Sequence, residues 1–495
     1  MSRTESPLIV DLPDEAATAR LGADLAVVLR RGDVVALGGG LGAGKTTLAR
    51  ALVRSLAGDP ALEVPSPTFT LVQAYATPGL AVAHFDLYRV AHESELAEIG
   101  LADAAGEGAV LVEWPERAGD WLPAERLDLA LEIAGSGRRA IIGGDDAFVG
   151  RLARSRAARA FLDASGWPAA ARTRIAGDAS ARAYERIVTP AGATAILMDW
   201  PPAGQLPPGD PRARFRARDA SAFVAVASAL RAAGLSAPGV FAADVAAGFV
   251  LMEDFGEPSF LADGLPAAER YAAAVEALAA IHAVPRPAEL PLPDGRRHRL
   301  PPFAGDALVP EVAVFVDSYV PHIRGAPVSA AERDALFAIW RDLGETLRHA
   351  EQSWVLFDVQ SANLFWLPER PDFARVGFID FQDMFHGPAA YDVAALLHDA
   401  RVTIPPALQA ALLDRYFALR AAADLAFDSG AFRTAFAVTA ALRTIKNMGA
   451  FARFAAAGND SYVSHLPRLR AYLSTALTEP VLSPFALWYE KHLPS

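Results

Sequence analysis

The chain has 495 residues, a formal net charge of -12 and a pI near 5.4, with 52% hydrophobic and 21% charged residues. This length predicts two or three domains, and the composition excludes long disordered tracts. The acidic balance gives no overall basic surface for nucleic acid, so small molecules or protein partners are favoured. Because the chain has no cysteine, disulfides, thiolate zinc sites and a cysteine nucleophile are excluded.

The beginning of the chain carries no targeting pattern. MSRTESPLIVDLPDE lacks a basic region followed by an apolar core, so no secretory signal is expected. Apolar runs such as AFAVTAALRTI are short and interrupted by charge, so no membrane span is predicted. We therefore expect a cytoplasmic protein without a membrane partner.

The first part of the chain alternates helix and strand signals. EAATARLGADLAVVLRRG has helical apolar spacing and ends at Gly32, which is typical of a helix C-terminus. DVVALGG predicts a short buried strand, followed by a glycine-rich loop and the helix KTTLARALVRSLAG. LAVAHFDLYRV and GAVLVEW predict two more buried strands, and LDLALEIAGSGRRAIIGG predicts a closing hairpin. The sequence thus predicts a compact α/β domain over residues 1–150.

The glycine-rich loop has the pattern of a phosphate loop. Gly39-x-x-x-x-Gly44-Lys45-Thr46 lies between a predicted strand and a predicted helix, as the mechanism requires. Glycines let backbone N–H groups point at phosphate oxygens, and the helix N-terminus adds positive potential. Lys45 is predicted to contact the β- and γ-phosphates, and the Thr46 hydroxyl to ligate Mg²⁺. The alternative, a chance match in a helix cap, is disfavoured by the elements on both sides.

Three further stretches supply polar groups that suit a nucleotide site. Thr68, in VPSPTFTLVQAY, lies beside two prolines on a stiff loop that is able to approach the γ-phosphate. Asp86, in HFDLYR, ends a buried run, where a Walker-B-like carboxylate would lie. Glu113, in LVEWPER, ends another strand, where it would ligate or orient Mg²⁺. Each acid alone is equally well explained as a solvated strand end, but their order within one small domain favours a shared site.

Taken together, GLGAGKTTLAR, SPTFTLV, HFDLYR and LVEWPER resemble, in this order, the bacterial TsaE family. This family is the small ATPase of the machinery that makes tRNA threonylcarbamoyladenosine (t6A37), and the resemblance covers roughly residues 7–145. It implies a P-loop NTPase domain that binds ATP and Mg²⁺ and acts with TsaB and TsaD subunits. Under this resemblance tRNA is only an indirect partner.

The resemblance also implies roles for particular residues. Lys45, Asp86 and Glu113 would be catalytic, and Thr46 and Glu113 would hold Mg²⁺. The family usually has an acid before LGAGKT, where this chain has Gly40; the phosphate cradle is intact, but any role of that acid is in doubt. The implied ATP contacts are Glu15, Gly39, Leu41, Gly42, Ala43, Gly44, Lys45, Thr46, Thr47, Thr68, Trp114 and Arg138.

A second region follows the Ala- and Arg-rich helical stretch RLARSRAARAFLDASG. TRIAGDASARAYERIVTP and ATAILMDWPP predict a strand–turn–strand sheet, in which Gly177–Ser180 would form a turn over ATP. From Leu265 onward helical patterns dominate. We predict one region over residues 157–495, with a small sheet-rich lobe at about 157–256 and a helical lobe at about 257–495.

The helical lobe contains the spacing of a phosphotransferase catalytic loop. In Asp358-x-x-x-x-Asn363, the aspartate would accept the substrate hydroxyl proton and the asparagine would ligate Mg²⁺. Asp380, in GFIDFQD, ends a short apolar run, as a second metal carboxylate must. Without the sheet-rich lobe before it, this spacing would favour three unrelated surface residues. His282 is expected to be a packed helix histidine without a catalytic role.

These features, with VLMEDFG as a lobe connector, resemble the aminoglycoside phosphotransferase-like kinases. GDASARAYERI, AILMDWPP and DFQDMFHGPAAYDVAAL resemble the AmgK subgroup, anomeric kinases of N-acetylmuramate and N-acetylglucosamine, over roughly residues 160–490. The resemblance implies a two-lobed protein-kinase-like fold, ATP and an amino-sugar substrate.

The second region departs from the kinase pattern at two places. Leu356-Phe357-Asp358 replaces the usual His-x-Asp, and Met198 and Asp199 fall where a β3 lysine would be. The whole chain is therefore predicted to join a TsaE-like ATPase to a small-molecule amino-sugar kinase. The alternative is that the second domain is a catalytically inactive kinase-like scaffold.

Overall fold

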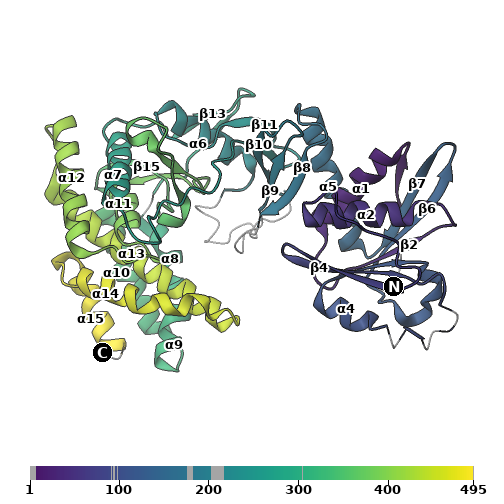
Figure 1. The fold of residues 1–495 in the computed structure, drawn as a ribbon. Helices are drawn as coiled ribbons and strands as arrows, with labels where there is room; N and C mark the ends of the chain where they lie inside the picture. Colours follow the sequence, from purple (N-terminus) through teal and green to yellow (C-terminus); the bar gives the residue numbers. More distant parts are fainter. Residues whose placement is uncertain are drawn as a thin grey trace. The chain divides into compact units, whose positions relative to one another are not determined.

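The computed structural model describes residues 7–90, 92, 95, 96, 99–175, 182–201, 217–303 and 305–493. It divides into two compact units, Met1–Asp199 and Trp200–Ser495, each of which is described by itself (Figure 1). The predicted turn at Gly177–Ser180 lies outside the described residues. Within the described part of the chain, no helix is long and apolar enough to cross a membrane. The predicted domain boundaries at residues 150 and 157 stay predictions.

The first unit is built on a seven-stranded sheet in the order β1-β7-β6-β2-β5-β4-β3. Strand β2 pairs in parallel with β5 and β6, and β5 pairs in parallel with β4, so the carboxyl ends of β2, β4 and β5 share one edge. The remaining neighbours are antiparallel. The strands are β1 (Leu8–Leu12), β2 (Val34–Gly38), β3 (Val72–Thr77), β4 (Leu80–Asp86), β5 (Ala109–Glu113), β6 (Leu127–Ala134) and β7 (Gly137–Gly144).

Helices cover both faces of this sheet because its central strands are apolar on both sides. Val35 and Leu37 of β2 pack in one core with α1, α2 and α5, whereas Val34 and Ala36 pack in a second core with Leu101 of α4. This alternation is the two-residue period of a strand. The helices are α1 (Glu15–Val28), α2 (Lys45–Ala57), α4 (Leu101–Glu107) and α5 (Asp146–Ala164).

Three antiparallel strands complete the first unit. Strand β8 pairs with β9, and β9 pairs with β10, so that Arg172 lies opposite Ile187 and Asp199 lies opposite Ala183. The strands are β8 (Ala171–Ile175), β9 (Ala183–Val188) and β10 (Thr194–Asp199).

The second unit is mainly helical, and its short strands pair in antiparallel fashion. A single π-helical turn, Phe315–Tyr319, lies between α8 and α9. The helices are α6 (Ala220–Ala232), α7 (Ala268–His282), α8 (Val309–Val314), α9 (Val320–Arg324), α10 (Ala330–Arg348), α11 (Ala390–Leu397), α12 (Pro406–Ala423), α13 (Ser429–Ala456), α14 (Leu466–Ala476) and α15 (Ser483–His492). The strands are β11 (Val240–Asp244), β12 (Phe249–Met252), β13 (Glu289–Pro291), β14 (Arg297–Arg299), β15 (Gln352–Val355), β16 (Leu364–Trp366), β17 (Val376–Phe378) and β18 (Phe385–Pro388).

The core of the second unit depends on a close approach between α13 and the end of α8. Helix α13 is 28 residues long and buries residues along most of its length. A Cβ atom at Gly449 would stand 2.5 Å from the carbonyl carbon and oxygen of Val314. Because these are backbone atoms, only a glycine fits at this crossing without a shift of one element.

We predict that Gly449→Ala lowers the free energy of unfolding by about 1–3 kcal/mol, the usual cost of overpacking a core. Helix propensity alone would raise it by about 1 kcal/mol. The matched control is Gly150→Ala in α5, where no atom lies within 4 Å of the new Cβ, and stability should rise slightly. Denaturant unfolding of the full chain measures both. A Gly449→Ala protein as stable as the wild type would contradict the close crossing.

Candidate functional sites

The phosphate loop connects β2 to α2. Gly44 adopts the left-handed conformation with φ of 103° at the N-terminus of α2, and no side chain caps this helix. The N–H groups of its first turn therefore suit a phosphate. The Lys45 ammonium donates to the carbonyl oxygens of Gly39 at 2.7 Å and Gly40 at 3.0 Å. The phosphate loop therefore wraps around the ammonium group of Lys45. Leu41 is exposed and Thr47 is half-buried.

Lys45 lies in a mostly buried environment. Its ammonium nitrogen stands 3.6 Å from the centroid of the Trp114 ring. Burial lowers the pKa of Lys45, although Glu113, Glu116 and Asp86 act in the opposite direction. The structure thus brings the predicted residues Lys45 and Trp114 into direct contact at the loop.

A hydrogen-bonded chain of side chains starts at the phosphate loop. The Thr46 hydroxyl donates to Oε2 of Glu113 at 3.1 Å, and Oε1 of Glu113 lies 2.9 Å from Nε2 of His84. Glu113 is 2% exposed and His84 is fully buried. The predicted magnesium ligands Thr46 and Glu113 therefore lie together, and their hydroxyl and carboxylate oxygens are ligands that Mg²⁺ prefers.

His84 is a site residue that the sequence reasoning missed. It lies two residues before Asp86 in β4, so both side chains lie on the same face of the strand. His84 Nδ1 is buried and has no hydrogen-bond partner among the described residues, which leaves Nε2–H to donate to Glu113. The His-x-Asp spacing at a strand end was the signal available for finding it.

Asp86 is held by the loop that was predicted to approach the γ-phosphate. It accepts hydrogen bonds from Ser66 at 2.7 Å and Thr68 at 2.6 Å, and from the N–H of Tyr88 at 3.0 Å. Burial raises the pKa of Asp86, but the hydrogen bonds outweigh burial and the pKa is lowered. Asp86 is thus an ionised carboxylate that fixes the position of Thr68.

Two predicted ATP contacts, Arg138 and Glu15, lie outside the phosphate-loop motif. In the described part of the chain, only Arg138 of these two forms hydrogen bonds with the loop. Arg138 donates from Nε to the carbonyl oxygen of Ala43 and from Nη2 to that of Gly42, both at 3.1 Å. Arg138, which lies in β7, therefore stabilises the phosphate loop through two backbone carbonyl groups. Glu15 is exposed in the first turn of α1 and makes no hydrogen bond or ion pair with the loop in the described part of the chain, so its role stays a prediction.

The predicted catalytic loop of the second unit follows β15. The Asn363 amide donates to the carbonyl oxygen of Asp358 at 2.9 Å, and the N–H of Ile379 donates to the carbonyl oxygen of Asn363 at 3.1 Å. Because β16 pairs with β17, Asn363 and Asp380 lie at neighbouring ends of two paired strands. Asp380 accepts a hydrogen bond from Gln382 at 3.0 Å. The chain fold thus brings the three predicted residues to one place, and their roles toward a metal stay predictions.

A metal ion can also be held by a cluster of acidic, histidine or cysteine side chains. Within the described residues, no group of three or more His, Cys, Asp or Glu side chains could hold a metal ion by itself. The two predicted sets do not depend on such a group, since each combines a carboxylate with a hydroxyl or an amide oxygen. Such mixed oxygen sets suit Mg²⁺, which usually also keeps water and substrate phosphates as ligands.

The loop that carries Asp358 is supported by a buried carboxylate, which the sequence reasoning also missed. Asp392 in α11 accepts hydrogen bonds from the N–H of Leu356 at 2.6 Å and of Phe357 at 3.0 Å. Burial raises the pKa of Asp392 to about 7, although these hydrogen bonds and Arg443 act to lower it. Asp392 lies in the stretch GPAAYDVAALL, where an acid within an apolar helix was the available signal.

Arg443 in α13 supports the same loop from another side. Its guanidinium donates to the carbonyl oxygen of Phe357, and Nη2 lies 3.5 Å from Oδ1 of Asp358. Phe357 has a φ of 80°, a conformation that is costly for a non-glycine residue. Its ring stacks on Tyr391 at 5.6 Å and lies 3.8 Å from the Lys446 ammonium. Asp358 is therefore positioned without the histidine that the kinase pattern usually contains.

His282 is a buried histidine of the second unit. It is buried at the end of α7, and Nδ1 lies 2.8 Å from the hydroxyl of Tyr416. Burial lowers the pKa of His282 to about 3, so the ring is neutral at ordinary pH. The prediction of a packed helix histidine is confirmed.

The two arrangements define the class of the protein: a P-loop ATPase domain followed by a kinase-like phosphotransferase region. Comparison with protein families agrees. Residues 12–141 match the family described as threonylcarbamoyl adenosine biosynthesis protein TsaE, and residues 171–426 match the phosphotransferase enzyme family. The chain therefore belongs to the phosphotransferase enzyme family and carries, before that region, a domain of the TsaE family.

Individual relatives divide between the same two regions. The chain is 36% identical over 359 residues to the N-acetylmuramate/N-acetylglucosamine kinase of Caulobacter vibrioides, covering 69% of this chain and 97% of the relative. It is 30% identical over 325 residues to the protein of the same name from Pseudomonas putida, covering 63% and 84%. It is 34% identical over 128 residues to the tRNA threonylcarbamoyladenosine biosynthesis protein TsaE of Rickettsia felis, covering 26% and 74%. Both predicted resemblances and the predicted fold class are confirmed, and both regions belong to enzyme families.

We predict that His84→Leu lowers kcat for ATP hydrolysis about 10- to 100-fold, the usual effect of losing a residue that orients a metal ligand. KM for ATP should change little, because Lys45 and the loop amides are untouched. His84→Gln retains an N–H donor toward Glu113 and should keep most of the activity. Phosphate release without a sugar acceptor gives both constants. An equal loss of activity in the two variants would contradict the orienting role.

A second prediction concerns the pH dependence of stability. The folded-state pKa of Asp392, about 7, lies above its ordinary value of 3.8, so the folded chain binds a proton that the unfolded chain has lost. Between these two values the contribution of Asp392 to stability therefore falls as pH rises, and it is constant above about pH 8. The Asp392→Asn protein lacks this dependence.

Urea unfolding of the wild type and Asp392→Asn across pH 4.5–8.5 tests the prediction. The difference in unfolding free energy, wild type minus variant, should fall by on the order of a few kcal/mol from the lowest to the highest pH. The subtraction removes the titration of the other groups. A difference that does not change with pH would contradict the prediction, because it would show that Asp392 is ionised in the folded chain throughout this range.

Proposed function

We propose that the chain hydrolyses ATP at the phosphate loop in support of t6A37 modification, and that its second region phosphorylates an amino sugar with ATP. The observation that carries the first activity is the contact between Thr46 and Glu113 beside Lys45. A P-loop lysine, a hydroxyl and a buried carboxylate at one helix N-terminus are the groups that bind a nucleotide with its metal. The name of the Rickettsia felis relative supports the role in tRNA modification.

Each residue of the first site has a task that follows from its position. The loop amides and Lys45 bind the phosphates, and Thr46 and Glu113 would hold Mg²⁺, which neutralises charge on the transferring phosphoryl group. His84 holds the Glu113 carboxylate in one orientation, and Arg138 stabilises the phosphate loop by donating to the carbonyl oxygen of Ala43. Asp86 fixes the position of Thr68, whose loop would approach the γ-phosphate. We propose TsaB- and TsaD-type subunits as the partners, with tRNA bound only indirectly.

The proposed sugar kinase activity depends on Asp358. Its carboxylate accepts the proton of the sugar hydroxyl while the hydroxyl oxygen attacks the γ-phosphorus, and ADP leaves with the pair of electrons of the broken P–O bond. Asn363 and Asp380 would hold Mg²⁺ at this site. We propose N-acetylmuramate or N-acetylglucosamine as the acceptor, because the relatives from Caulobacter vibrioides and Pseudomonas putida are named for these sugars.

An inactive scaffold was the alternative, because the catalytic-loop histidine and the β3 lysine are missing. The contacts of Asp392 and Arg443 favour the active kinase, since they position the loop by other means. Both proposed reactions use ATP and one serves tRNA modification, so we propose that the chain works in the cytoplasm.

Two single variants of the full chain test the proposal. Lys45→Ala should lower phosphate release without sugar by at least about 100-fold while sugar phosphorylation stays within about tenfold of wild type. Asp358→Asn should do the reverse, because it removes the base and leaves the phosphate loop intact. Phosphate release is measured with and without TsaB- and TsaD-type subunits, and phospho-sugar formation with both sugars. Absence of sugar turnover in the wild type would refute the kinase, and unchanged hydrolysis in Lys45→Ala would refute the ATPase assignment.

A further inference from the structure

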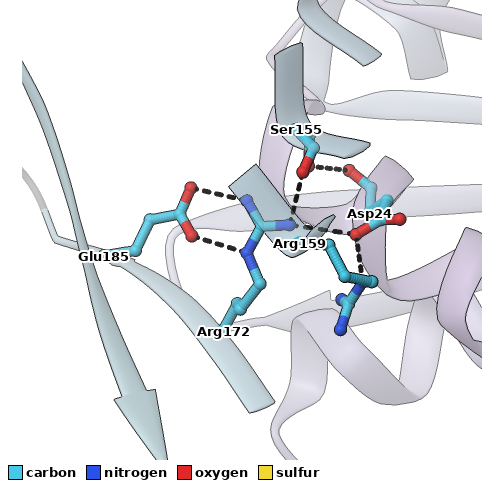
Figure 2. Close-up of polar contacts among 5 residues, drawn as sticks. All are labelled: Asp24, Ser155, Arg159, Arg172 and Glu185. Atoms are coloured by element: carbon cyan, nitrogen blue, oxygen red, sulfur yellow. Dashed lines mark hydrogen bonds and ion pairs between the residues drawn. The ribbon is translucent and has the colours of Figure 1, made fainter. Parts of the chain in front are cut away.

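A buried cluster of charged side chains joins α1, α5, β8 and β9 (Figure 2). Arg172 in β8 donates to both carboxylate oxygens of Glu185 in β9, at 2.7 and 3.0 Å, and to Oδ1 of Asp24 in α1 at 2.9 Å. Arg159 in α5 donates to the same oxygen of Asp24 at 2.6 Å. Ser155 adds two contacts, accepting from Arg172 at its carbonyl oxygen and donating from its hydroxyl to the carbonyl oxygen of Asp24. The two arginines and two carboxylates balance in charge.

The cluster connects the two family regions of the chain. Asp24 lies within residues 12–141, which match the TsaE family, whereas Arg172 and Glu185 lie within residues 171–426, which match the phosphotransferase family. All members belong to the first compact unit. The side chain of Arg172 is fully buried, so it keeps its charge only by means of both carboxylates. The contact therefore fixes the geometry between α1 and the β8–β9 hairpin.

Helix α5, which lies between the two family matches, is held on both sides. Arg151 donates to both carboxylate oxygens of Asp33, next to β2, at 2.7 and 2.8 Å. Arg154 forms an ion pair with Asp199, at the end of β10, at 2.6 Å. Helix α5 is therefore a fixed element between the sheet of the first domain and strands β8–β10.

The same helix that carries Asp24 also touches the helix of the phosphate loop. A Cβ atom at Gly22 of α1 would stand 2.8 Å from the Cβ of Ala51 and 2.9 Å from the backbone nitrogen of Leu52, both in α2. Helix α2 begins at Lys45. A displacement of α2 would therefore reach α1 through this close contact, and β8 through the charge cluster.

We propose that this face of α1 is an interaction surface through which nucleotide binding at the phosphate loop changes the stability of the β8–β9 hairpin. The hairpin flanks the stretch that was predicted to turn over ATP in the kinase region. Coupling of this kind is reciprocal, so a change in the stability of the hairpin also changes nucleotide binding at the phosphate loop. The inference rests on the proposed binding of ATP by the phosphate loop.

Amide hydrogen exchange of the full chain, with and without ADP and Mg²⁺, tests the coupling. Nucleotide should slow exchange in α2 and, by at least about fivefold, in β8 and β9. In Lys45→Ala, which leaves nucleotide binding by the kinase region unchanged, the slowing in β8 and β9 should be clearly smaller than in the wild type, because only the contribution from the phosphate loop is lost. In Arg172→Met with Glu185→Gln, which removes one charge of each sign and leaves Asp24 paired with Arg159, α2 should still be protected, but the slowing in β8 and β9 should be no larger than in Lys45→Ala.

The matched control is Arg139→Met with Asp11→Asn, which removes an exposed ion pair between β7 and β1 and should respond as the wild type does. Equal slowing of β8 and β9 in the wild type and Lys45→Ala would overturn the coupling, because the nucleotide would then act at the kinase region itself. Slowing of α2 without slowing of β8 and β9 would also overturn it and leave the cluster as a structural contact. Absence of slowing in α2 would overturn the proposed nucleotide binding, and the coupling with it.

Discussion

The parallel pairing of β5 between β2 and β4 is the constraint on which the first site depends. In this register Leu37 lies beside Glu113, and Glu113 lies beside Asp86. The carboxyl ends of parallel strands in an open α/β sheet meet at one edge, where ligands bind. The phosphate loop, Asp86 and Glu113 therefore arrive at one place through backbone pairing alone. Side-chain hydrogen bonds, such as that from His84, then select one orientation for each carboxylate.

The second site is assembled by a different physical principle, since its catalytic loop has little regular structure. Two N–H groups of the loop would be buried without partners, at a cost of about 1–3 kcal/mol each, if Asp392 were absent. The left-handed conformation of Phe357 adds a cost of about 1–3 kcal/mol, which stacking on Tyr391 and the Lys446 ammonium offset. The loop geometry is therefore over-determined by contacts from α11 and α13. These contacts hold the loop although a leucine stands in place of the usual histidine.

The features that the sequence predicted are those encoded by neighbouring residues. The phosphate loop, its flanking strand and helix, and the acids at strand ends follow from local spacing, and the family resemblances agreed with the comparisons. His84 and Arg443 were missed because their partners lie 29 and 85 residues away; the His-x-Asp spacing marks His84 locally but does not identify Glu113 as its partner. Arg138 was reached only through the resemblance, and Glu15, predicted by the same route, is exposed. Long-range polar contacts are thus the part of a site that one sequence does not determine.

The charge cluster bears on why the two regions share a chain. Shared expression alone would require only a tether, and a flexible linker would serve. Here the connection is a helix of 19 residues held by ion pairs on both sides. Buried ion clusters add little stability compared with apolar packing, but removing one partner leaves an uncompensated buried charge. The junction of Asp24, Arg159, Arg172 and Glu185 therefore holds β8 and β9 against α1 and α5 in one arrangement, which a flexible tether would not do.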